Sequence, residues 1–384
     1  MTSEWRTIRA ADFIDFNPRL SLKKGDIATK VAMDKLKPFT KKIPETEKAE
    51  FNGGAKFCNG DTVMARITPC LENGKTAYVD MLDDGEIGFG STEFIVMRAK
   101  TGISDPQFVY YTAINPVFRN VAIKSMVGSS GRQRVQQSVL EELELSVPDL
   151  DEQRRIGDFL ARIDEKIALN DRINDNLQQQ AKSLYEEMFL NNPDADMVSG
   201  TLSDIATITM GQSPSGSSYN EESVGEIFYQ GRAEFGFRFP TRRLFTTEPK
   251  RMAEPGDVLL SVRAPVGDLN VAYEKCCIGR GLGAIHSKTG DSSFMLYTMF
   301  ALKPQLDVFN GEGTVFGSIN RNGLSNLPVN IPSAEEIAKF EATVRPMDNL
   351  IRTNYEEICR LQSIRDSLLP KLMSGEIDVS DIQL

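Results

Sequence analysis

Two segments of the sequence, 149–190 and 333–384, place apolar residues at heptad spacing over five consecutive heptads. In the first segment the a positions are Ile156, Ile163, Asn170, Leu177 and Leu184, and the d positions are Leu160, Ile167, Asn174, Ala181 and Met188. In the second the a positions are Phe340, Met347, Asn354, Leu361 and Leu368, and the d positions are Val344, Ile351, Ile358, Arg365 and Leu372. This pattern predicts two helices of about 38 residues, each roughly 57 Å long, that pair with each other as an antiparallel coiled coil.

Asn170 and Asn354 each occupy an a position near the middle of their predicted helix. A polar residue in an apolar seam lowers stability but fixes the register of the helices. Two interpretations stay open: a tolerated polar residue at the edge of the seam, or a register lock. Because a positions face d positions in an antiparallel pair, Asn354 is expected opposite either Ile167 or Asn174, and the second register would pair two amides.

The second half of the chain repeats the pattern of the first, since Pro148 and Pro332 are the first of nine matching pairs that all share one separation. The other matches are Glu152, Asp164, Ile167, Asn170, Leu177, Gln178, Ser183 and Leu184 with Glu336, Asp348, Ile351, Asn354, Leu361, Gln362, Ser367 and Leu368. A repeat at a fixed offset predicts one structural unit used twice.

The sequence outside the helices alternates short β-type runs, such as Asp61–Ile67 and Phe94–Met97, with turns rich in Gly, Asn and Pro. A helical stretch over 106–123 is expected to break at Pro116. We therefore predict an α+β fold with a pseudo-twofold internal repeat. Two mixed α/β domains, 1–148 and 198–332, are separated by two long helices, 149–190 and 333–384, that form the antiparallel coiled coil.

The net charge of −10 is unevenly distributed, because each helical segment carries 6 basic and 10 acidic residues. Acidic segments do not lie against phosphates, so any contact with nucleic acid is expected from the near-neutral large domains. The five cysteines lack C-x-x-C spacing and predict neither a zinc site nor disulfides. The sequence contains no long apolar run and no secretory signal pattern, which predicts a cytoplasmic protein without a membrane span.

Catalytic motifs are incomplete in this sequence. Asn115-Pro116-Val117-Phe118 has the wrong third residue for the base-gripping loop of an amino-methyltransferase and is more simply a helix break. The run from Gly211 to Ser217 (GQSPSGS) lacks the lysine of a phosphate-binding loop. Asp164-Glu165-Lys166 would point in different directions on a helix, and His286 is the single histidine. We expect no catalytic site and no metal site.

Three segments resemble the specificity (S) subunits of type I restriction–modification systems. Val147–Ile167 (VPDLDEQRRIGDFLARIDEKI) is similar to the helix that follows each target-recognition domain of that family, as is Leu368–Val379 (LLPKLMSGEIDV). Gly256–Pro265 (GDVLLSVRAP) is similar to a strand inside those domains. One departure is Glu336-Ile337 where the first copy has Glu152-Gln153, which puts a capping interaction in the second copy in doubt.

The resemblance implies a subunit without catalytic activity that recognises double-stranded DNA. It implies two target-recognition domains, each followed by a spacer helix. Methyltransferase (M) and restriction (R) subunits would be its partners, and S-adenosylmethionine, ATP and Mg would be held by those partners rather than by this chain. Because the two domains differ in sequence, their half-sites should differ, so the target is expected to be asymmetric and bipartite. The half-sites should lie about one helical turn apart, roughly 34–36 Å.

Candidate base-reading residues lie in loops rich in Arg, Gln, Ser and Asn. In the first domain they are Arg132, Gln133 and Arg134 of the loop 128–135, with Arg66 and Thr68 as second choices. In the second domain they are Gln212, Ser213, Ser215, Arg232, Arg263, Arg280, Asn320 and Arg321. The pairs Lys41 with Lys42 and Arg242 with Arg243 are expected to contact phosphates.

An apolar rim on the helices is a candidate docking surface for a methyltransferase subunit, with burial inside the chain as the alternative; it comprises Leu150, Phe159, Leu369 and Leu372. Two other hypotheses stay open for the whole chain. A coiled-coil scaffold that binds only proteins would show no DNA-dependent behaviour, and a self-contained methyltransferase would bind S-adenosylmethionine alone. A neighbouring reading frame with an Asn-Pro-Pro-aromatic motif would favour the specificity subunit.

Overall fold

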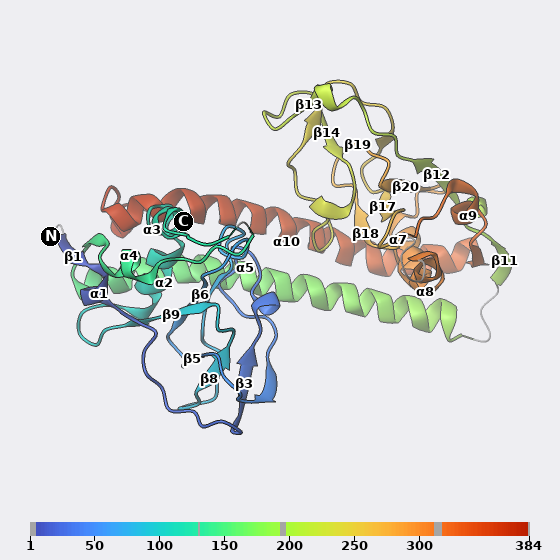
Figure 1. The fold of residues 1–384 in the computed structure, drawn as a ribbon. Helices are drawn as coiled ribbons and strands as arrows, with labels where there is room; N and C mark the ends of the chain where they lie inside the picture. Colours follow the sequence, from blue (N-terminus) through green and yellow to red (C-terminus); the bar gives the residue numbers. More distant parts are fainter. Residues whose placement is uncertain (1–4, 130, 193–196, 311–316, 383–384) are drawn as a thin grey trace. The chain divides into compact units, whose positions relative to one another are not determined.

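A computed structural model describes residues 5–129, 131–192, 197–310 and 317–382 (Figure 1). The chain divides into two compact units, residues 1–172 with 355–384 (unit 1) and residues 173–354 (unit 2). Two long helices, α5 (Leu150–Tyr185) and α10 (Ala334–Ser374), each contribute one segment to each unit. Helix α5 continues as a π-helical turn over Glu186–Leu190.

Unit 1 contains an α+β domain built on two small four-stranded sheets. The strand orders are β2-β9-β6-β7 and β4-β3-β8-β5, and a separate antiparallel pair joins β1 to β10. The strands are β1 Arg6–Arg9, β2 Ile14–Phe16, β3 Ile27–Val31, β4 Glu47–Glu50, β5 Ala55–Phe57, β6 Thr62–Ala65, β7 Thr76–Tyr78, β8 Gly88–Gly90, β9 Phe94–Ala99 and β10 Glu144–Val147. The shorter helices are α1 Ala10–Phe13, η1 Met33–Lys35, α2 Pro106–Ile114, α3 Pro116–Lys124, α4 Gln137–Glu141 and η6 Val379–Asp381.

Unit 2 repeats this arrangement, because its sheet β12-β20-β17-β18 has the same antiparallel order as β2-β9-β6-β7. Its second sheet is β13-β15-β14-β19-β16, and β11 pairs with β21. The strands are β11 Met197–Thr201, β12 Ala206–Met210, β13 Tyr219–Asn220, β14 Glu226–Tyr229, β15 Phe245–Thr246, β16 Met252–Ala253, β17 Val258–Ser261, β18 Leu269–Val271, β19 Cys276–Ile278, β20 Leu282–Ser287 and β21 Pro328–Pro332. The shorter helices are α6 Leu202–Ile205, η3 Gly216–Ser218, η4 Arg232–Glu234, α7 Ser292–Ala301, α8 Lys303–Asp307, η5 Val308–Asn310 and α9 Arg321–Ser325.

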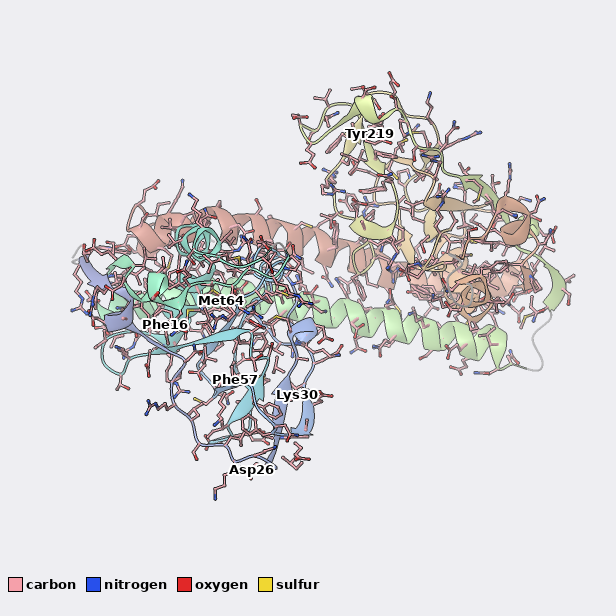
Figure 2. The ribbon with its side chains drawn as sticks, in the orientation of Figure 1. Phe16, Asp26, Lys30, Phe57, Met64 and Tyr219 are labelled. Carbon is pink, nitrogen blue, oxygen red and sulfur yellow. The ribbon has the colours of Figure 1, made fainter. Side chains whose placement is uncertain are left out.

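The cores of the two domains form around central strands that are buried at consecutive positions, as β6 and β17 are throughout their length, so both faces of these strands pack against apolar side chains. Figure 2 shows Phe57 and Met64 among the packed strands of unit 1 and Asp26 at the outer end of the domain. Phe57 and Met64 are fully buried, whereas Asp26 is exposed. The predicted α+β fold with an internal repeat and two long helices is therefore confirmed.

The expected helix break at Pro116 is also confirmed, and the structure shows how Asn115 produces it. Asn115 ends α2 and begins α3, and its side-chain Oδ1 accepts a hydrogen bond from the backbone N–H of Val117 at 3.0 Å. This is an N-cap, which satisfies a backbone donor that the helix leaves unpaired. Asn115 and Pro116 thus serve helix geometry.

Within each unit the segments of α5 and α10 run antiparallel. In unit 1 Asn170 donates to Glu357 Oε2 at 2.7 Å, and Arg365 donates to Asp164 Oδ1 at 2.6 Å. Residue numbers therefore increase along one helix where they decrease along the other. Around these polar pairs Ile163, Ile167 and Ile358 pack against one another and form the apolar part of the seam. The seam therefore alternates buried apolar contacts with polar ones.

In unit 2 Asn354 donates to Asn174 Oδ1 at 2.8 Å, and farther along the same pair of segments the Tyr185 and Phe340 rings lie 5.7 Å apart. Of the two registers open from the heptad pattern, the structure has Asn354 opposite Asn174. Asn170 instead uses a carboxylate of the facing helix, so the two a-position asparagines have different partners.

The start of each long helix is capped, but by different residues. The Glu152 N–H donates to Asp149 Oδ1 at 2.9 Å, and the Glu336 N–H donates to Ser333 Oγ at 3.3 Å. Gln153 does not cap its helix: it donates to the Pro148 and Ile103 carbonyls and accepts from the Asp105 N–H. Its replacement by isoleucine in the second copy therefore removes a tether to the domain and leaves the helix cap in place.

Two residues of the expected docking rim are buried inside unit 1. Leu369 is 4% exposed and Leu372 is fully buried, and both belong to the apolar core that includes Phe108 and Leu160. Phe159 packs partly against the same core, and Leu150 is half-buried. Of the two alternatives left open for this rim, burial inside the chain holds for Leu369 and Leu372, because the end of α10 packs onto the first domain.

Candidate nucleic-acid interface

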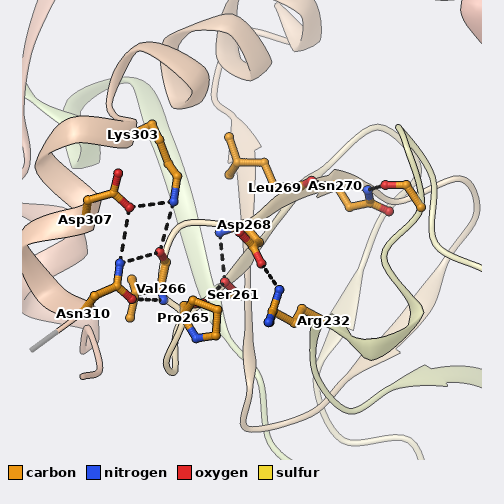
Figure 3. A network of polar contacts seen from close by, with 11 residues as sticks. Arg232, Ser261, Pro265, Val266, Asp268, Leu269, Asn270, Lys303, Asp307 and Asn310 are labelled. Carbon is orange, nitrogen blue, oxygen red and sulfur yellow. Dashed lines mark hydrogen bonds and ion pairs between the residues drawn. The ribbon is translucent and has the colours of Figure 1, made fainter. Parts of the chain in front are cut away.

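In unit 2 the candidate site is built on the turn between β17 and β18. The Ser261 hydroxyl donates to the Pro265 carbonyl at 2.7 Å and accepts from the Asp268 N–H at 3.0 Å, which closes the turn (Figure 3). The Ala264 N–H donates to the Gly317 carbonyl at 3.0 Å. These backbone contacts hold Arg263 at the exposed tip of the turn, where it forms a β-bridge with Ser318.

A cavity of about 580 Å³ opens beside this turn, and it brings several of the sequence candidates together. Arg263, Arg280 and Asn320 line it, and the backbone N–H of Arg280 donates to Ser213 Oγ at 3.2 Å. Both arginines are exposed, and neither forms an ion pair with a carboxylate in the described ranges. Two guanidinium groups therefore face solvent from one hollow, which is a suitable arrangement for contacting base edges or phosphates.

Some of the other candidate DNA-binding side chains of unit 2 already form hydrogen bonds within the chain. The side-chain oxygen of Asn320 caps α9 by accepting from the Gly323 N–H at 2.9 Å. Ser215 exchanges a hydrogen bond with Ser217 at 2.8 Å, and Gln212 is exposed. Arg321 lies exposed in the first turn of α9.

Arg232 belongs to a different part of the surface. It forms an ion pair with Asp268 (Figure 3). It also lines a separate cavity of about 620 Å³ together with Lys182 and Lys303. Lys303 is itself bound to Asp307 at 2.7 Å and to the carbonyl of Val266. The structure therefore does not bring Arg232 into the cavity lined by Arg263 and Arg280.

In unit 1 residues 133–135 lie against residues 66–68, so the two sets of candidate residues predicted for this domain form one cluster. Ile67 forms a β-bridge with Arg134, the Thr68 N–H donates to the Gln133 carbonyl at 3.0 Å, and the Val135 N–H donates to the Arg66 carbonyl at 2.8 Å. The cluster is thus assembled from backbone hydrogen bonds between segments far apart in sequence.

The same backbone contacts define equivalent positions in the two units. In unit 1 the Val135 N–H donates to the Arg66 carbonyl, and in unit 2 the Ile319 N–H donates to the Val262 carbonyl. The β-bridge between Ile67 and Arg134 in unit 1 likewise corresponds to the β-bridge between Arg263 and Ser318 in unit 2. The N–H groups of Arg66 and Val262 donate to the carbonyls of Glu93 and Gly281, both at 2.9 Å. The equivalent pairs of side chains are thus Ile67 with Arg263, Arg134 with Ser318 and Glu93 with Gly281.

Charges are compensated differently at these equivalent positions. Arg134 makes a bidentate ion pair with Glu93, with N–O distances of 2.6 to 3.0 Å, and this hydrogen-bonded guanidinium lowers the pKa of the Glu93 carboxyl. Arg66 donates to the Val135 carbonyl at 3.2 Å. Arg132 is exposed and forms no ion pair with any described carboxylate. Of the three arginines in this cluster, Arg132 is thus the exposed one without a carboxylate partner among the described residues.

Ser318 and Gly317 line the unit 2 cavity although sequence reasoning did not select them. The internal repeat indicates Ser318, because Ser318 follows Arg134 in the sequence by the same number of residues as Pro332 follows Pro148. Because the repeat has serine at this position where the first copy has arginine, selecting basic residues alone does not identify Ser318.

The expected phosphate contact of Lys41 is wrong, because Lys41 is only 5% exposed. Its ammonium donates to Gln107 and to the hydroxyl of Tyr111, inside a cage of three tyrosine rings whose centroids lie 5.0 to 5.4 Å away. Of the other expected phosphate ligands, Lys42 pairs with Asp80, Arg242 with Glu274, and Arg243 with Glu234. Carboxylates of the same domain thus neutralise these three.

Burial lowers the pKa of Lys41 from 10.5 to about 8, which predicts a pH effect on stability. Between these two values the unfolded chain binds the proton and the folded chain does not, so stability should rise as the pH increases. Relative to Lys41→Met, the wild-type free energy of unfolding should increase by about 3 kcal/mol from about pH 7 to about pH 10.5. The fluorescence of Trp5, the single tryptophan, reports unfolding of unit 1. A pH-independent difference between the two proteins would contradict this prediction.

Among residues 5–129, 131–192, 197–310 and 317–382, no group of three or more His, Cys, Asp or Glu is placed to hold a metal ion. No helix in the part that the structure describes is long and apolar enough to cross a membrane. His286 shares a hydrogen bond of 2.6 Å with Asp257.

Comparison with known proteins gives the family. Residues 3–179 and 195–360 each match the model of the type I restriction modification DNA specificity domain. The chain is 28% identical over 342 residues to a protein of Methanocaldococcus jannaschii named for the specificity subunit of the type I restriction enzyme MjaX, covering 83% of this chain and 79% of that protein. It is 32% identical over 196 residues to the specificity subunit of the type I restriction enzyme EcoAI of Escherichia coli, covering 51% of this chain and 28% of that protein.

A solved structure shares the fold. The S subunit of a type I restriction–modification system from M. genitalium superposes with a TM-score of 0.59 at 17% identity, covering 96% of both chains. Two mixed domains with long helices and a repeated loop cluster define the class, a two-domain DNA specificity protein. The chain belongs to the family of type I restriction–modification DNA specificity proteins and carries two copies of the family's domain.

Proposed function

We propose that this chain is the DNA-recognition subunit of a type I restriction–modification complex and reads an asymmetric, bipartite target in double-stranded DNA. The observation that carries the proposal is the pair of equivalent loop clusters with different side chains. Where unit 1 has Ile67, Arg134 and Glu93, unit 2 has Arg263, Ser318 and Gly281. A shared backbone frame with different donors and acceptors should read two different half-sites.

Base reading is assigned to the exposed arginines of the unit 1 loop cluster and of the unit 2 cavity that pair with no described carboxylate. These are Arg132 in unit 1 and Arg263 and Arg280 in unit 2, each of which can donate two hydrogen bonds to the edge of a guanine. Gln133 lies beside Arg132 and suits adenine. Arg134, Arg66, Thr68, Gln212, Ser213, Ser215, Asn320 and Arg321 remain proposed contacts of the same two surfaces, and Arg232 a proposed contact of the neighbouring one.

Partner subunits supply the chemistry in this proposal. M subunits would bind S-adenosylmethionine and methylate adenine, and R subunits would bind ATP and Mg and cleave. The net charge of −10 gives the isolated chain little non-specific attraction for DNA, so the complex should bind far more tightly than the chain alone.

The test is to map methylated adenines in the host genome with and without this gene. The proposal expects one asymmetric bipartite motif whose methylation disappears when the gene is deleted. An unchanged set of methylated adenines would refute it. Mapping the adenines that the purified complex methylates in unmethylated genomic DNA would give the target sequence on which variants of this chain can be tested.

The paired helices are proposed to set the distance between the half-sites, which predicts the effect of lengthening them. One heptad inserted after Arg172 and one after Asn354 would add about 10.5 Å to each helix while keeping the apolar seam in phase. The unread spacer of the target should grow by about three base pairs at 3.4 Å each, and the half-site bases should stay the same. Methylation mapping measures both, and a changed half-site with an unchanged spacer would contradict the prediction.

A further inference from the structure

In unit 2 one buried arginine joins the recognition domain to both long helices. Arg238 follows η4 and is 4% exposed. Its guanidinium donates to Asp348 Oδ1 of α10 at 2.7 Å and to Gln178 Oε1 of α5 at 3.0 Å. The hydroxyl of Tyr297, on α7 of the domain, accepts from the same guanidinium at 3.2 Å and donates to Asp348 at 3.0 Å.

The equivalent position in unit 1 is Lys41. The Val271 N–H, at the end of β18, donates to the Arg238 carbonyl at 2.8 Å, and the Tyr78 N–H, at the end of β7, donates to the Lys41 carbonyl at 2.9 Å. Each domain therefore extends a cation from the same place in its frame toward its long helices.

The polar chain around Lys41 follows the same order of cation, tyrosine and aspartate. The Lys41 ammonium donates to the Tyr111 hydroxyl at 3.3 Å, and that hydroxyl donates to Asp164 Oδ2 at 2.6 Å. Asp164 precedes Asp348 by the separation of the repeat. Lys41 itself, however, reaches Gln107 and Tyr111 of its own domain, whereas Arg238 reaches the helices directly.

The two units also differ in what holds the helices together. In unit 1 Arg365 of α10 pairs with Asp164 of α5 at 2.6 Å, with both side chains buried, so the helices are joined without help from the domain. The position that matches Arg365 in unit 2 is Ala181, which is fully buried and uncharged. In unit 2 the cation that faces the helical aspartate thus comes from the recognition domain.

We propose that Arg238 is a positioning residue that fixes the second recognition domain on the helices and so determines which spacer length the protein accepts. This inference rests on the proposed function. A buried ion pair adds little net stability compared with apolar packing, but its several directional hydrogen bonds allow few alternative arrangements. Without the guanidinium, apolar contacts would still attach the domain, over a wider range of angles. Lys41 should matter less, because Arg365 holds Asp164 independently.

The experiment measures methylation by the complex with its M subunits on duplexes that carry the mapped target and spacers of the native length, one base pair shorter and one base pair longer. Arg238→Met keeps an apolar stem of similar length and removes the charge. We expect the preference for the native spacer over the altered ones to fall about tenfold, with the half-site bases unchanged. Tyr297→Phe, which removes only one hydroxyl, should shift the same ratio in the same direction and remains informative if Arg238→Met does not fold.

Lys41→Met is the matched control, because it removes the equivalent cation of unit 1, and its spacer preference should stay within about twofold of wild type. A spacer preference unchanged in both Arg238→Met and Tyr297→Phe would overturn this inference alone. Equal loss of spacer and half-site selectivity in these variants would also overturn it, since that result indicates general damage to the site. A wild-type complex without sequence-dependent methylation would overturn the proposed function and this inference with it.

Discussion

Replacing Arg263 and Arg280 together by alanine should reduce methylation of the target by at least about thirtyfold, because each bidentate contact to a base contributes about 1–3 kcal/mol of discrimination. Both exposed side chains line the same cavity, Arg263 from the connection between β17 and β18 and Arg280 from the connection between β19 and β20, so their removal should leave the fold intact. The measurement is the initial rate of methyl transfer by the complex on the mapped target and on duplexes with single changes in each half-site.

Selectivity should relax in one half-site and stay intact in the other, because only unit 2 is altered. Arg242→Ala is the matched control: Arg242 is an exposed arginine of the same domain that already pairs with Glu274. It should reduce the methylation of all sequences by the same factor, and that factor should be smaller than the loss caused by the double variant. Equal relaxation of both half-sites by the double variant would contradict the assignment of the cavity to base reading.

Replacing Arg365 by methionine should lower the free energy of unfolding of unit 1 by about 3–5 kcal/mol, because it leaves the buried Asp164 carboxylate without its ion-pair partner. Burial alone would lower the pKa of Arg365, but Asp164 raises it, so this guanidinium stays charged. Denaturant unfolding followed by Trp5 fluorescence measures the change.

Two further variants separate a lost partner from lost packing. Replacing Asp164 and Arg365 together by leucine should restore part of the stability, since the unpaired carboxylate is removed. The recovery should be incomplete, because the Tyr111 hydroxyl then loses its acceptor and the Lys41 ammonium loses a nearby carboxylate. Lys166→Ala breaks the more exposed pair with Glu357, at 3.2 Å on the same helices, and should cost less than about 1 kcal/mol. A loss below about 1 kcal/mol for Arg365→Met would show that water reaches Asp164 and that the pair does not hold the helices.

The architecture was accessible from the sequence because it depends on periodicity. Heptad spacing over 149–190 and 333–384 predicted the two helices, and the constant separation of matching residues predicted a repeated domain. Asn115 and Pro116 predicted the break between α2 and α3 from local backbone chemistry alone. These features follow from each residue's own preferences and from its spacing to similar residues.

The polar interior was not accessible in the same way. Arg365 occupies a predicted d position of an apolar seam, and its pairing with Asp164 depends on which residues the antiparallel register brings opposite each other. Lys41 was expected at a phosphate and is caged by three tyrosines, because folding places the 41–42 loop beside α2. Arg238 carried no signal at all, since its partners come from three separate helices.

By itself the sequence determined the helices, the repeated frame and the loops that bear arginine, because hydrophobic periodicity and turn chemistry act over a few residues. Only the tertiary structure decided which of those arginines remain available to a ligand. Arg134 is neutralised by Glu93, while Gly281 occupies the position equivalent to Glu93 and offers no carboxylate to the unit 2 cavity. The reason is physical: charge compensation acts through space over a few ångströms, between residues that the chain brings together only when it folds.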